Sequence, residues 1–492
     1  MSIVLVVDSR DDWLGSFEGV QTVDPREYLT DPQFSSRRGT KVYNLCRSYA
    51  YQSLGYYVSL LAEARGQRPI PDVTTIQDLR GTAAIRLIPQ ELEELIRKSL
   101  EPITSDEFTL SVYFGRNVAQ RYEKLSRELY SLFQAPLLRF TFGRRGNKWR
   151  LRRASAIGLK SVPDNHRQFV SETALNHFAG RFISRHKRQQ TRYDLAILHN
   201  PKEGDLAPSN EAALKKLCKA AQGLGVAAEL IQREDGGRLL EFDALFIRET
   251  TAVSHYTYEM ARRAEATGMV VIDDPLSILR CSNKVFLAEL LARAKVPTPL
   301  TLVVHRKNID QVGEQIGFPC VLKRPDSAFS QGVVKAMDIA ELKAKLSEFL
   351  EDSELVIAQR YMRTDFDWRI GILDGRPLFA SKYHMARGHW QIAKHEQGVS
   401  TRFGKAETLP VELAPRKAVA MAQKSAALIG SGFYGVDIKE AEGNFYVIEV
   451  NDNPNLDSGV EDAVLRDDVY VRIVESFIRR IEARKKSIHG DF

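Results

Sequence analysis

The most informative oxygen donors of the chain are Glu449 and Asn451, which lie two residues apart in an apolar run typical of a buried strand. Side chains at positions i and i+2 of a strand lie on one face, so the carboxylate and the amide point the same way. A second apolar run, 433–438, contains Asp437, and the turn-forming residues 440–444 predict a hairpin of the two runs. Three hard oxygen donors would then face one point, which predicts a Mg²⁺ site. Mg²⁺ prefers one or two carboxylates and leaves the remaining positions to water and phosphate oxygens. The alternative is an acidic hairpin face in water.

Two lysines occupy positions suited to phosphate. Lys284 begins an amphipathic helix predicted over 283–294, and phosphate is stabilised at a helix start. Lys323 ends a predicted strand, and the segment 326–335 after it supplies small, hydroxylic and glycine residues between two strands. Such a loop folds its backbone donors over phosphates and closes on a nucleotide. The loop includes Ser327, Ser330, Gln331 and Gly332. An ordinary surface turn is the competing interpretation, since the chain has no GxxxxGK[ST] motif.

A further strand is predicted over 355–362, and its backbone could pair with an adenine edge. The residues concerned are Gln359, Arg360, Tyr361 and Met362. Asp367 and Arg369 follow and share one face of the next strand. Asp367 and Arg369 could form a structural ion pair, or they could bind the ribose and phosphate of a nucleotide.

The elements that must position these residues form an ordinary globular protein of 492 residues, a length typical of about three domains. The start has no basic segment of a signal peptide, and no apolar stretch is long enough to span a membrane, so we expect a cytoplasmic protein without a membrane partner. The four cysteines are scattered and predict reduced thiols. The net charge of +7 suits nucleotides and acidic amino acids as well as nucleic acid.

The first segment opens with a strand at 3–7, continues into a helical pattern around 43–65, and includes a basic hairpin at 139–153. The basic stretch 181–192 is interpreted as a linker. An open parallel sheet is predicted from strands at 193–198, 244–248 and 269–274, with a helix at about 210–224 between the first two. Ser209 is interpreted as the N-cap of that helix.

The order of these residues resembles the ATP-grasp superfamily, and within it the RimK-like carboxylate–amine ligases. The motifs that carry the resemblance are Lys284, Lys323 with its loop, the strand at 355–362, Asp367-x-Arg369, Asp437 and Glu449-x-Asn451. It covers roughly residues 193–480. Residues 43–49 and 55–66 also look like the amino-terminal domain attached to some RimK-like proteins.

The resemblance implies an α/β and α+β fold in three parts. These are an N-terminal RimK-associated α/β domain (1–190), a pre-ATP-grasp Rossmann-like unit (191–280) and a two-subdomain ATP-grasp domain (281–485). By analogy Lys284 and Lys323 bind the phosphates of ATP and 327–332 form the lid. Residues 359–362 hold adenine and Asp367 contacts the ribose. Asp437, Glu449 and Asn451 hold Mg²⁺, and Mn²⁺ would also fit.

The implied reaction activates a carboxylate to an acylphosphate, which an amine then attacks. Arg369, Arg387 and Arg402 are candidates to hold the substrate carboxylate and the developing oxyanion, and Arg369 is preferred. The expected partners are an amino acid such as glutamate and an amine, which can be a small molecule, a peptide or a protein terminus. We also expect a homo-oligomer. The alternatives are an ATP-grasp phosphotransferase and an ATP-regulated RNA- or ribosome-associated binding protein, the latter motivated by the basic segments, although neither carries a recognised RNA motif.

Overall fold

The computed structural model describes residues 3–9, 13, 19–35, 40–80, 85, 88, 90–146, 148–185, 191–326, 332–394 and 402–489. The chain divides into two compact units, Met1–Arg192 with Glu234–Phe242, and Tyr193–Arg233 with Asp243–Phe492. Within the described residues no helix is both long and apolar enough to cross a membrane.

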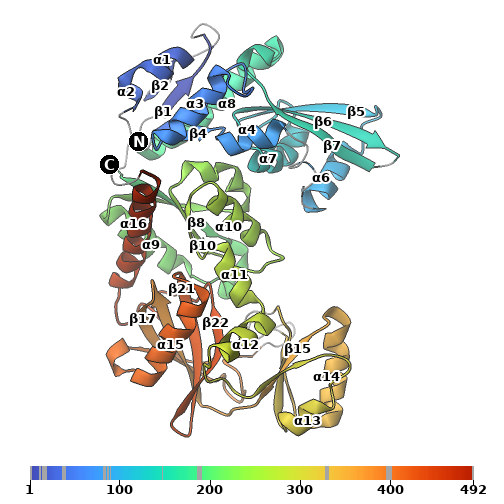
Figure 1. Cartoon of the computed structure of the whole chain (residues 1–492), viewed down its shortest axis with the longest axis vertical. Coiled ribbons are helices and arrows are strands. Elements are labelled where there is room, and N and C mark those ends of the chain that lie inside the picture. The colour runs from blue at the N-terminus through green and yellow to red at the C-terminus, as the bar shows by residue number, and fades with distance from the viewer. Residues whose placement is uncertain are drawn as a thin grey trace. The chain divides into compact units, whose positions relative to one another are not determined.

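The first unit contains a parallel sheet in the order β2-β1-β3-β4 and an antiparallel sheet in the order β5-β6-β7 (Figure 1). Its strands are β1 (Ile3–Val6), β2 (Val20–Val23), β3 (Lys41–Asn44), β4 (Arg68–Ile70), β5 (Glu107–Tyr113), β6 (Leu137–Arg145) and β7 (Lys148–Ala156). Its helices are α1 (Pro25–Thr30), α2 (Pro32–Ser35), α3 (Leu54–Ala64), α4 (Val73–Arg80), α6 (Gln90–Leu100), α7 (Glu123–Leu132) and α8 (Asp164–Arg185).

Two sequence predictions for this unit are wrong. The helical pattern around 43–65 begins inside a strand, because Tyr43 lies in the fully buried β3 and α3 starts only after its N-cap, Ser53, whose hydroxyl accepts from the amide of Tyr56. The stretch 181–192 is not a linker throughout, since α8 continues to Arg185. The basic segment 139–153 is a hairpin, as predicted.

The second unit begins with a parallel sheet in the order β11-β10-β8-β9. Its elements are β8 (Tyr193–His199), α9 (Glu211–Gly223), β9 (Val226–Ile231), β10 (Ala244–Arg248), α10 (Tyr256–Ala266), β11 (Val270–Ile272) and α11 (Pro275–Ser282). Strand β9 was not predicted from the sequence. The N-cap of α9 is Asn210 rather than Ser209, because the Asn210 side chain accepts the amide hydrogen of Ala213.

A small sheet, β12-β15-β13-β14, and a larger one, β20-β17-β16-β21-β22, follow. The small sheet is built from β12 (Thr301–Val304), β13 (Cys320–Lys323), β14 (Val333–Ala336) and β15 (Val356–Arg360), with α12 (Lys284–Arg293), α13 (Gln311–Gln315) and α14 (Ile339–Asp352). The larger one has β16 (Phe366–Leu373), β17 (Arg376–His384), β20 (Ala406–Leu409), β21 (Phe433–Ala441) and β22 (Asn444–Asn451), with α15 (Arg416–Ile429) and α16 (Asp468–His489). A two-stranded sheet joins β18 (Ala393–Lys394) to β19 (Arg402–Phe403).

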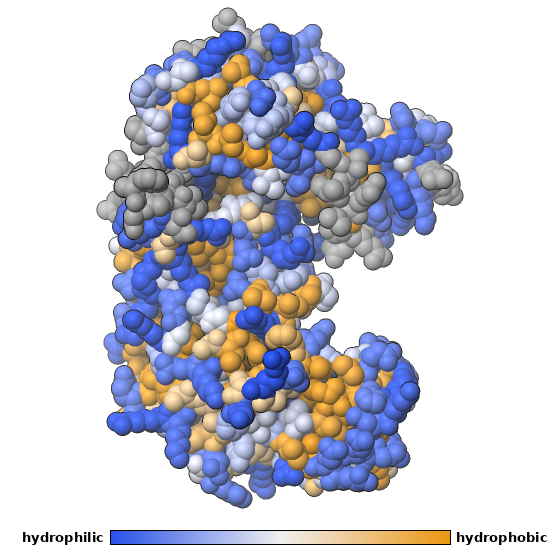
Figure 2. All heavy atoms as spheres, viewed as in Figure 1, coloured by the Kyte–Doolittle hydropathy of each residue, from blue (hydrophilic) through white to orange (hydrophobic). Residues whose placement is uncertain are grey.

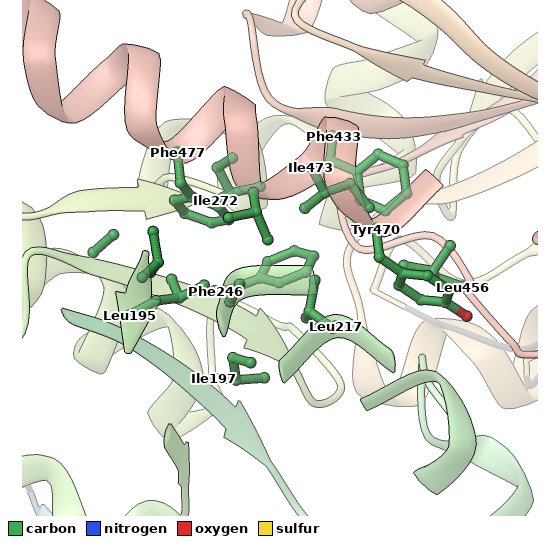
Figure 3. Close-up of a cluster of buried hydrophobic side chains, with 14 of the residues drawn as sticks. Leu195, Ile197, Leu217, Phe246, Ile272, Phe433, Leu456, Tyr470, Ile473 and Phe477 are labelled. Carbon is green, nitrogen blue, oxygen red and sulfur yellow. The ribbon is translucent and has the colours of Figure 1, made fainter. Parts of the chain in front are cut away.

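The core of the second unit crosses the boundary between its sheets. Phe246 of β10 contacts Phe433 of β21 and Phe477 of α16, with ring centroids 6.4 and 5.4 Å apart (Figure 3). Tyr470 and Ile473 of α16 belong to the same cluster and are fully buried. The parallel sheet and the carboxyl-terminal helix therefore fold around shared apolar surface.

Candidate active site

One face of the larger sheet carries polar side chains at successive positions of its central strands. Along β21 the side chains of Val436 and Ile438 enter the core, whereas Asp437 between them points to the other face. Arg369 of β16, Asp437 and Glu449 of β22 are direct cross-strand neighbours. The sheet register therefore brings one cation and two carboxylates into a single row.

The three predicted metal ligands come together through the β21–β22 hairpin. Its turn uses positive φ at Glu442 and Gly443, 52° and 72°, as a tight hairpin turn requires. Asn451 pairs with Gly435 across the two strands, and its amide nitrogen lies 3.3 Å from Oδ2 of Asp437. A Cβ atom at position 435 would lie only 2.7 Å from the side chain of Pro454. Because Gly435 lacks this atom, the loop after β22 can pack directly on this face.

Each carboxylate of this row has a cation beside it. Nζ of Lys284, at the first position of α12, lies 2.9 Å from Oε1 of Glu449. Burial alone would raise the pKa of Glu449, but Lys284 and Lys323 outweigh it and hold the pKa of this carboxyl below its usual range. Arg369 donates from Nε and Nη2 to the two oxygens of Asp437 at 2.7 and 2.8 Å. Glu449 is thus ionised at neutral pH, and Asp437 is held by a bidentate pair.

Lys323 approaches the same region from the small sheet. Its neighbour Leu322 enters the core beneath α14, so Lys323 lies on the opposite face of β13 and is 8% exposed. Burial lowers the pKa of Lys323 to about 8, Glu449 acts against this shift, and Lys284 and Lys439 add to it. The face also includes Lys335 of β14 and Gln359 of β15, which both neighbour Val321 across the sheet. Lys335 had no predicted role.

The predicted adenine-binding strand is β15 and the residues after it. Gln359 is buried and donates to Thr301 Oγ1 at 2.9 Å, whereas the exposed Arg360 extends toward the carbonyl of Ile316. The Tyr361 ring packs edge-on against Trp390 at 5.8 Å, and the Lys335 ammonium lies 4.8 Å from the Tyr361 ring centroid. Met362 is half-buried. An aromatic wall with a cation beside it therefore follows the strand.

Asp367, the predicted ribose contact, already has a cationic partner. Lys439 Nζ lies 2.6 Å from Asp367 Oδ1, and both groups bond the hydroxyl of Thr364. Burial raises the pKa of Asp367, and Lys439 opposes that shift. Lys439 was not predicted at the site, because its contact with Asp367 depends on the register of β16 against β21. Lys439 lies two residues after Asp437 in the predicted strand, and this spacing could have indicated that the two side chains share one face.

Arg369 is further supported by Tyr383 of β17, whose ring centroid lies 4.9 Å from the guanidinium carbon. The Tyr383 hydroxyl donates to Glu461, and Arg369 Nη1 donates to Asn455 Oδ1 at 3.3 Å. Burial is the largest cause that raises the pKa of Glu461. Glu461 was not expected at the site from the sequence.

The loop after β22 is fastened to the parallel sheet by Arg248, which is 1% exposed. Its guanidinium donates to Asn453 Oδ1 at 2.6 Å, to the Pro454 carbonyl at 2.7 Å and to the Ser209 hydroxyl at 3.0 Å. Asp457 accepts the amide hydrogen of Asn210 at 2.7 Å. Asn453 and Asp457 therefore shape this loop, whereas Asn455 faces Arg369.

Two predicted arginines belong to backbone segments outside the strands of this row. Arg387 is exposed in a turn, and Arg402 begins β19. Gly332 has a positive φ of 70° and its carbonyl accepts from the Arg324 amide at 2.9 Å, which places the end of the loop beside β13. Three predicted loop contacts, Ser327, Ser330 and Gln331, lie outside the described residues.

The donor set of the hairpin fits a hard divalent cation. Among the residues that the structure describes, no group of three or more His, Cys, Asp and Glu side chains could hold a metal ion. The hairpin instead offers two carboxylates and one amide, and Mg²⁺ commonly takes only one or two carboxylates beside phosphate oxygens. The chemistry of the ligands therefore agrees with a metal held jointly by protein and nucleotide.

Comparison with protein families finds two matches. Residues 25–173 match a family described as the RimK-like ATPgrasp N-terminal domain, and residues 281–476 match the RimK-like ATP-grasp domain. Both matched segments fall within stretches for which sequence analysis stated a resemblance.

Comparison with curated proteins finds relatives over about half of the chain. A probable alpha-L-glutamate ligase of Thioalkalivibrio sulfidiphilus is 30% identical over 232 residues, which are 46% of this chain and 74% of the relative. A probable alpha-L-glutamate ligase of Syntrophotalea carbinolica is 27% identical over 255 residues, 51% of this chain and 80% of the relative. Among solved structures, D-alanine–D-alanine ligase of Bacillus anthracis aligns with a TM-score of 0.46 and 18% identity, covering 60% of this chain and 99% of that one.

Proposed function

The chain belongs to the RimK-like ATP-grasp family and is an ATP-dependent carboxylate–amine ligase, and we propose that it joins an amino acid such as glutamate to the amine of an acceptor. The observation that carries this proposal is the row Arg369, Asp437 and Glu449, with Lys284 and Lys323 beside it. Phosphoryl transfer needs positioning and charge neutralisation more than a nucleophilic side chain, and this row supplies both.

Lys284 and Lys323 would hold the phosphates of ATP, and the polar face of the small sheet would hold its base. Gln359, Arg360, Tyr361 and Met362 would contribute to the adenine site, and Asp367 to the ribose site through the Lys439 pair. Lys335 adds a further cation at the edge of this site. The loop 327–332 would cover the phosphates.

Asp437, Glu449 and Asn451 would hold Mg²⁺ together with phosphate oxygens, and Mn²⁺ has similar ligand preferences. When bound, the metal supplies positive charge that neutralises the phosphates during transfer. Members of this family use ATP and Mg²⁺. The two carboxylates also remain paired with Arg369 and Lys284, so the site balances charge before any ligand enters it.

In the proposed reaction a carboxylate oxygen of the amino acid attacks the γ-phosphorus of ATP, the bond to the β,γ-bridging oxygen breaks, and ADP leaves. The acceptor amine then attacks the acyl carbon, loses a proton, and displaces phosphate to give an amide. Arg369 is the preferred residue to stabilise the oxyanion of this second step, since its guanidinium lies in the row of the metal ligands. Arg387 and Arg402 remain candidates for holding the substrate carboxylate.

The direct test is phosphate release with Mg²⁺ and ATP across a panel of amino acids, offered singly and in pairs, with mass spectrometry of the products. We expect an amide product and ADP only when an acid and an amine are both present. A stable phosphorylated amino acid in place of an amide would instead identify a phosphotransferase. The variant Glu449→Gln should release much less phosphate under the same conditions. We further propose that the reaction takes place in the cytoplasm and that the protein is a homo-oligomer.

A further inference from the structure

The antiparallel sheet β5-β6-β7 of the first unit has two faces of opposite character. On one face, the aromatic side chains of Phe140, Phe142 and Trp149 are buried against α6 and α7 in a single hydrophobic cluster. Side chains alternate between the faces of a strand, so the residues between these aromatics point to the other face. The second face is therefore formed by residues outside this cluster.

Three cross-strand rows make up the second face. They are Ser111–Arg139–Ser155, Thr109–Thr141–Arg153 and Glu107–Gly143–Arg150. A shift in register at Thr141 adds Arg152 to the exposed side as the extra residue of a bulge. Every side chain of these rows is polar, and we call Arg139, Arg150, Arg152 and Arg153 the arginine face.

Gly143 allows one of these arginines to lie flat on the sheet. A Cβ at Gly143 would stand 1.8 Å from Nε of Arg152, a distance that no side chain tolerates. Arg152 thus crosses β6 above Gly143 and donates to Oε1 of Glu107 on β5 at 3.0 Å. The guanidinium is held in place while its side chain stays 53% exposed.

Most of the charge on the arginine face is not neutralised within the protein. In the part of the chain that the structure describes, Glu107 is the single acid of the three rows, and it pairs with Arg152. Arg139 bonds the carbonyl of Ser161 at 2.7 Å, and neither Arg150 nor Arg153 has an ion-pair partner among the described residues. Figure 2 shows mostly hydrophilic surface, in blue, where this hairpin projects at the upper right.

The residue types of the arginine face indicate which kind of anionic partner it could bind. Proteins that bind single-stranded RNA on a sheet stack bases on exposed aromatic rings, but here the aromatics of the hairpin are all on the buried face. Side chains that share one face of a strand repeat along that strand at about 7 Å, which is also the spacing of alternate side chains in an extended peptide. Guanidinium groups bind carboxylates with two parallel hydrogen bonds. The charge of the face suits a peptide rich in carboxylates, and the lack of exposed aromatic rings on the hairpin argues against single-stranded RNA.

We propose that the arginine face docks an acidic segment of a peptide acceptor, such as a chain already extended with glutamate. This inference rests on the proposed ligase function, because it names the class of acceptor that the enzyme uses. It assigns to the amino-terminal domain the capture of the acceptor rather than any step of the chemistry. The docked acceptor supplies the amine, and the carboxylate to be activated belongs to an amino acid held at a second place on the protein.

The test is the binding of a fluorescent oligoglutamate of about eight residues, long enough to span the sheet, to the full-length protein. We expect Arg150→Glu/Arg153→Glu to weaken binding by about tenfold or more and added salt to weaken wild-type binding. The matched control is Arg97→Glu/Lys124→Glu, which makes the same change of charge on exposed helical positions of this domain and should bind as wild type does. Thermal unfolding of each variant checks that the domain remains folded.

Two further results would overturn the docking proposal: equal affinity of both double variants, or no oligoglutamate binding while single-stranded RNA binds through the same arginines. Turnover of free glutamate with a small amine separates this proposal from the ligase function. We expect Arg150→Glu/Arg153→Glu to keep that turnover and to lose turnover of the acidic peptide. If the wild type binds the peptide but produces no amide from any acid and amine, docking stands and the proposed function fails.

Discussion

Arg369 and Asp437 face each other on neighbouring strands and share two hydrogen bonds of 2.7 and 2.8 Å. Burial acts to lower the pKa of Arg369, but Asp437 more than offsets it, so the net shift is upward and the guanidinium stays charged. A cation bound at Asp437 would have to share this carboxylate with Arg369. The candidate oxyanion donor and the candidate metal ligand are therefore coupled, and a change in one alters the other.

Replacing Arg369 by lysine tests the first member of this pair. The shorter ammonium side chain would keep the charge but lose the bidentate geometry, so we expect kcat to fall about 100-fold while the Kd of ATP changes little. Steady-state kinetics and calorimetric ATP binding measure the two effects. Arg376→Lys, at an exposed position where β17 begins, is the matched control. A normal kcat in Arg369→Lys would remove this residue from the chemistry.

Glu449→Gln tests the metal assignment. The amide keeps the size of the side chain but loses the charge, so we expect turnover to fall about 100-fold or more, with partial recovery at high Mg²⁺. ADP formation against Mg²⁺ concentration measures this, and Glu442→Gln at the exposed tip of the same hairpin should remain active. Wild-type dependence on Mg²⁺ in Glu449→Gln contradicts the assignment.

The pH dependence of ATP binding tests Lys323. Burial lowers its pKa to about 8 in the free protein, so the ammonium becomes neutral as the pH rises through that value. Anionic phosphate prefers the charged form, and we expect the Kd of ATP to rise by up to about tenfold per pH unit above about pH 8. Lys323→Arg keeps its charge at these pH values and should show a flat profile. Identical profiles for the two proteins would mean that another group controls binding.

Lys439 is expected to position Asp367 for the nucleotide. Lys439→Leu leaves a buried carboxylate without its cation, and we expect the KM of ATP to rise about three- to tenfold with a smaller change in kcat. Lys439→Arg should restore part of the loss. Lys424→Leu on the exposed side of α15 is the control. A lower melting temperature with an unchanged KM would assign Lys439 a structural role only.

Arg248→Met tests the link between the parallel sheet and the loop after β22. Loss of several hydrogen bonds from a buried cation should destabilise the second unit by about 3 kcal/mol. Urea unfolding followed by fluorescence measures it, with Arg262→Met at an exposed site of α10 as the control. Equal midpoints for the two variants would show that the network adds no net stability.

The sequence predicted the hairpin of Asp437 and Glu449 because alternation and turn residues are local signals. It could not predict Lys439 beside Asp367, or Glu461 beside Tyr383, since those contacts depend on how distant strands and loops meet. The prediction of a helix from residue 43 is wrong for a related reason. The four-residue strand β3 is buried at every position, so it shows no alternation that would distinguish it from a helix.

The network around Arg248 also limits how this protein could be rebuilt from parts. The loop at 453–457 binds Arg248, Ser209 and Asn210, and α16 packs on Phe246. These contacts join segments that are more than 200 residues apart in sequence, so each segment is matched to its own partner in this chain. A chimera that takes residues 193–280 from a relative would carry mismatched partners for this loop and helix. Recombination should succeed only when residues 452–489 are exchanged together with them.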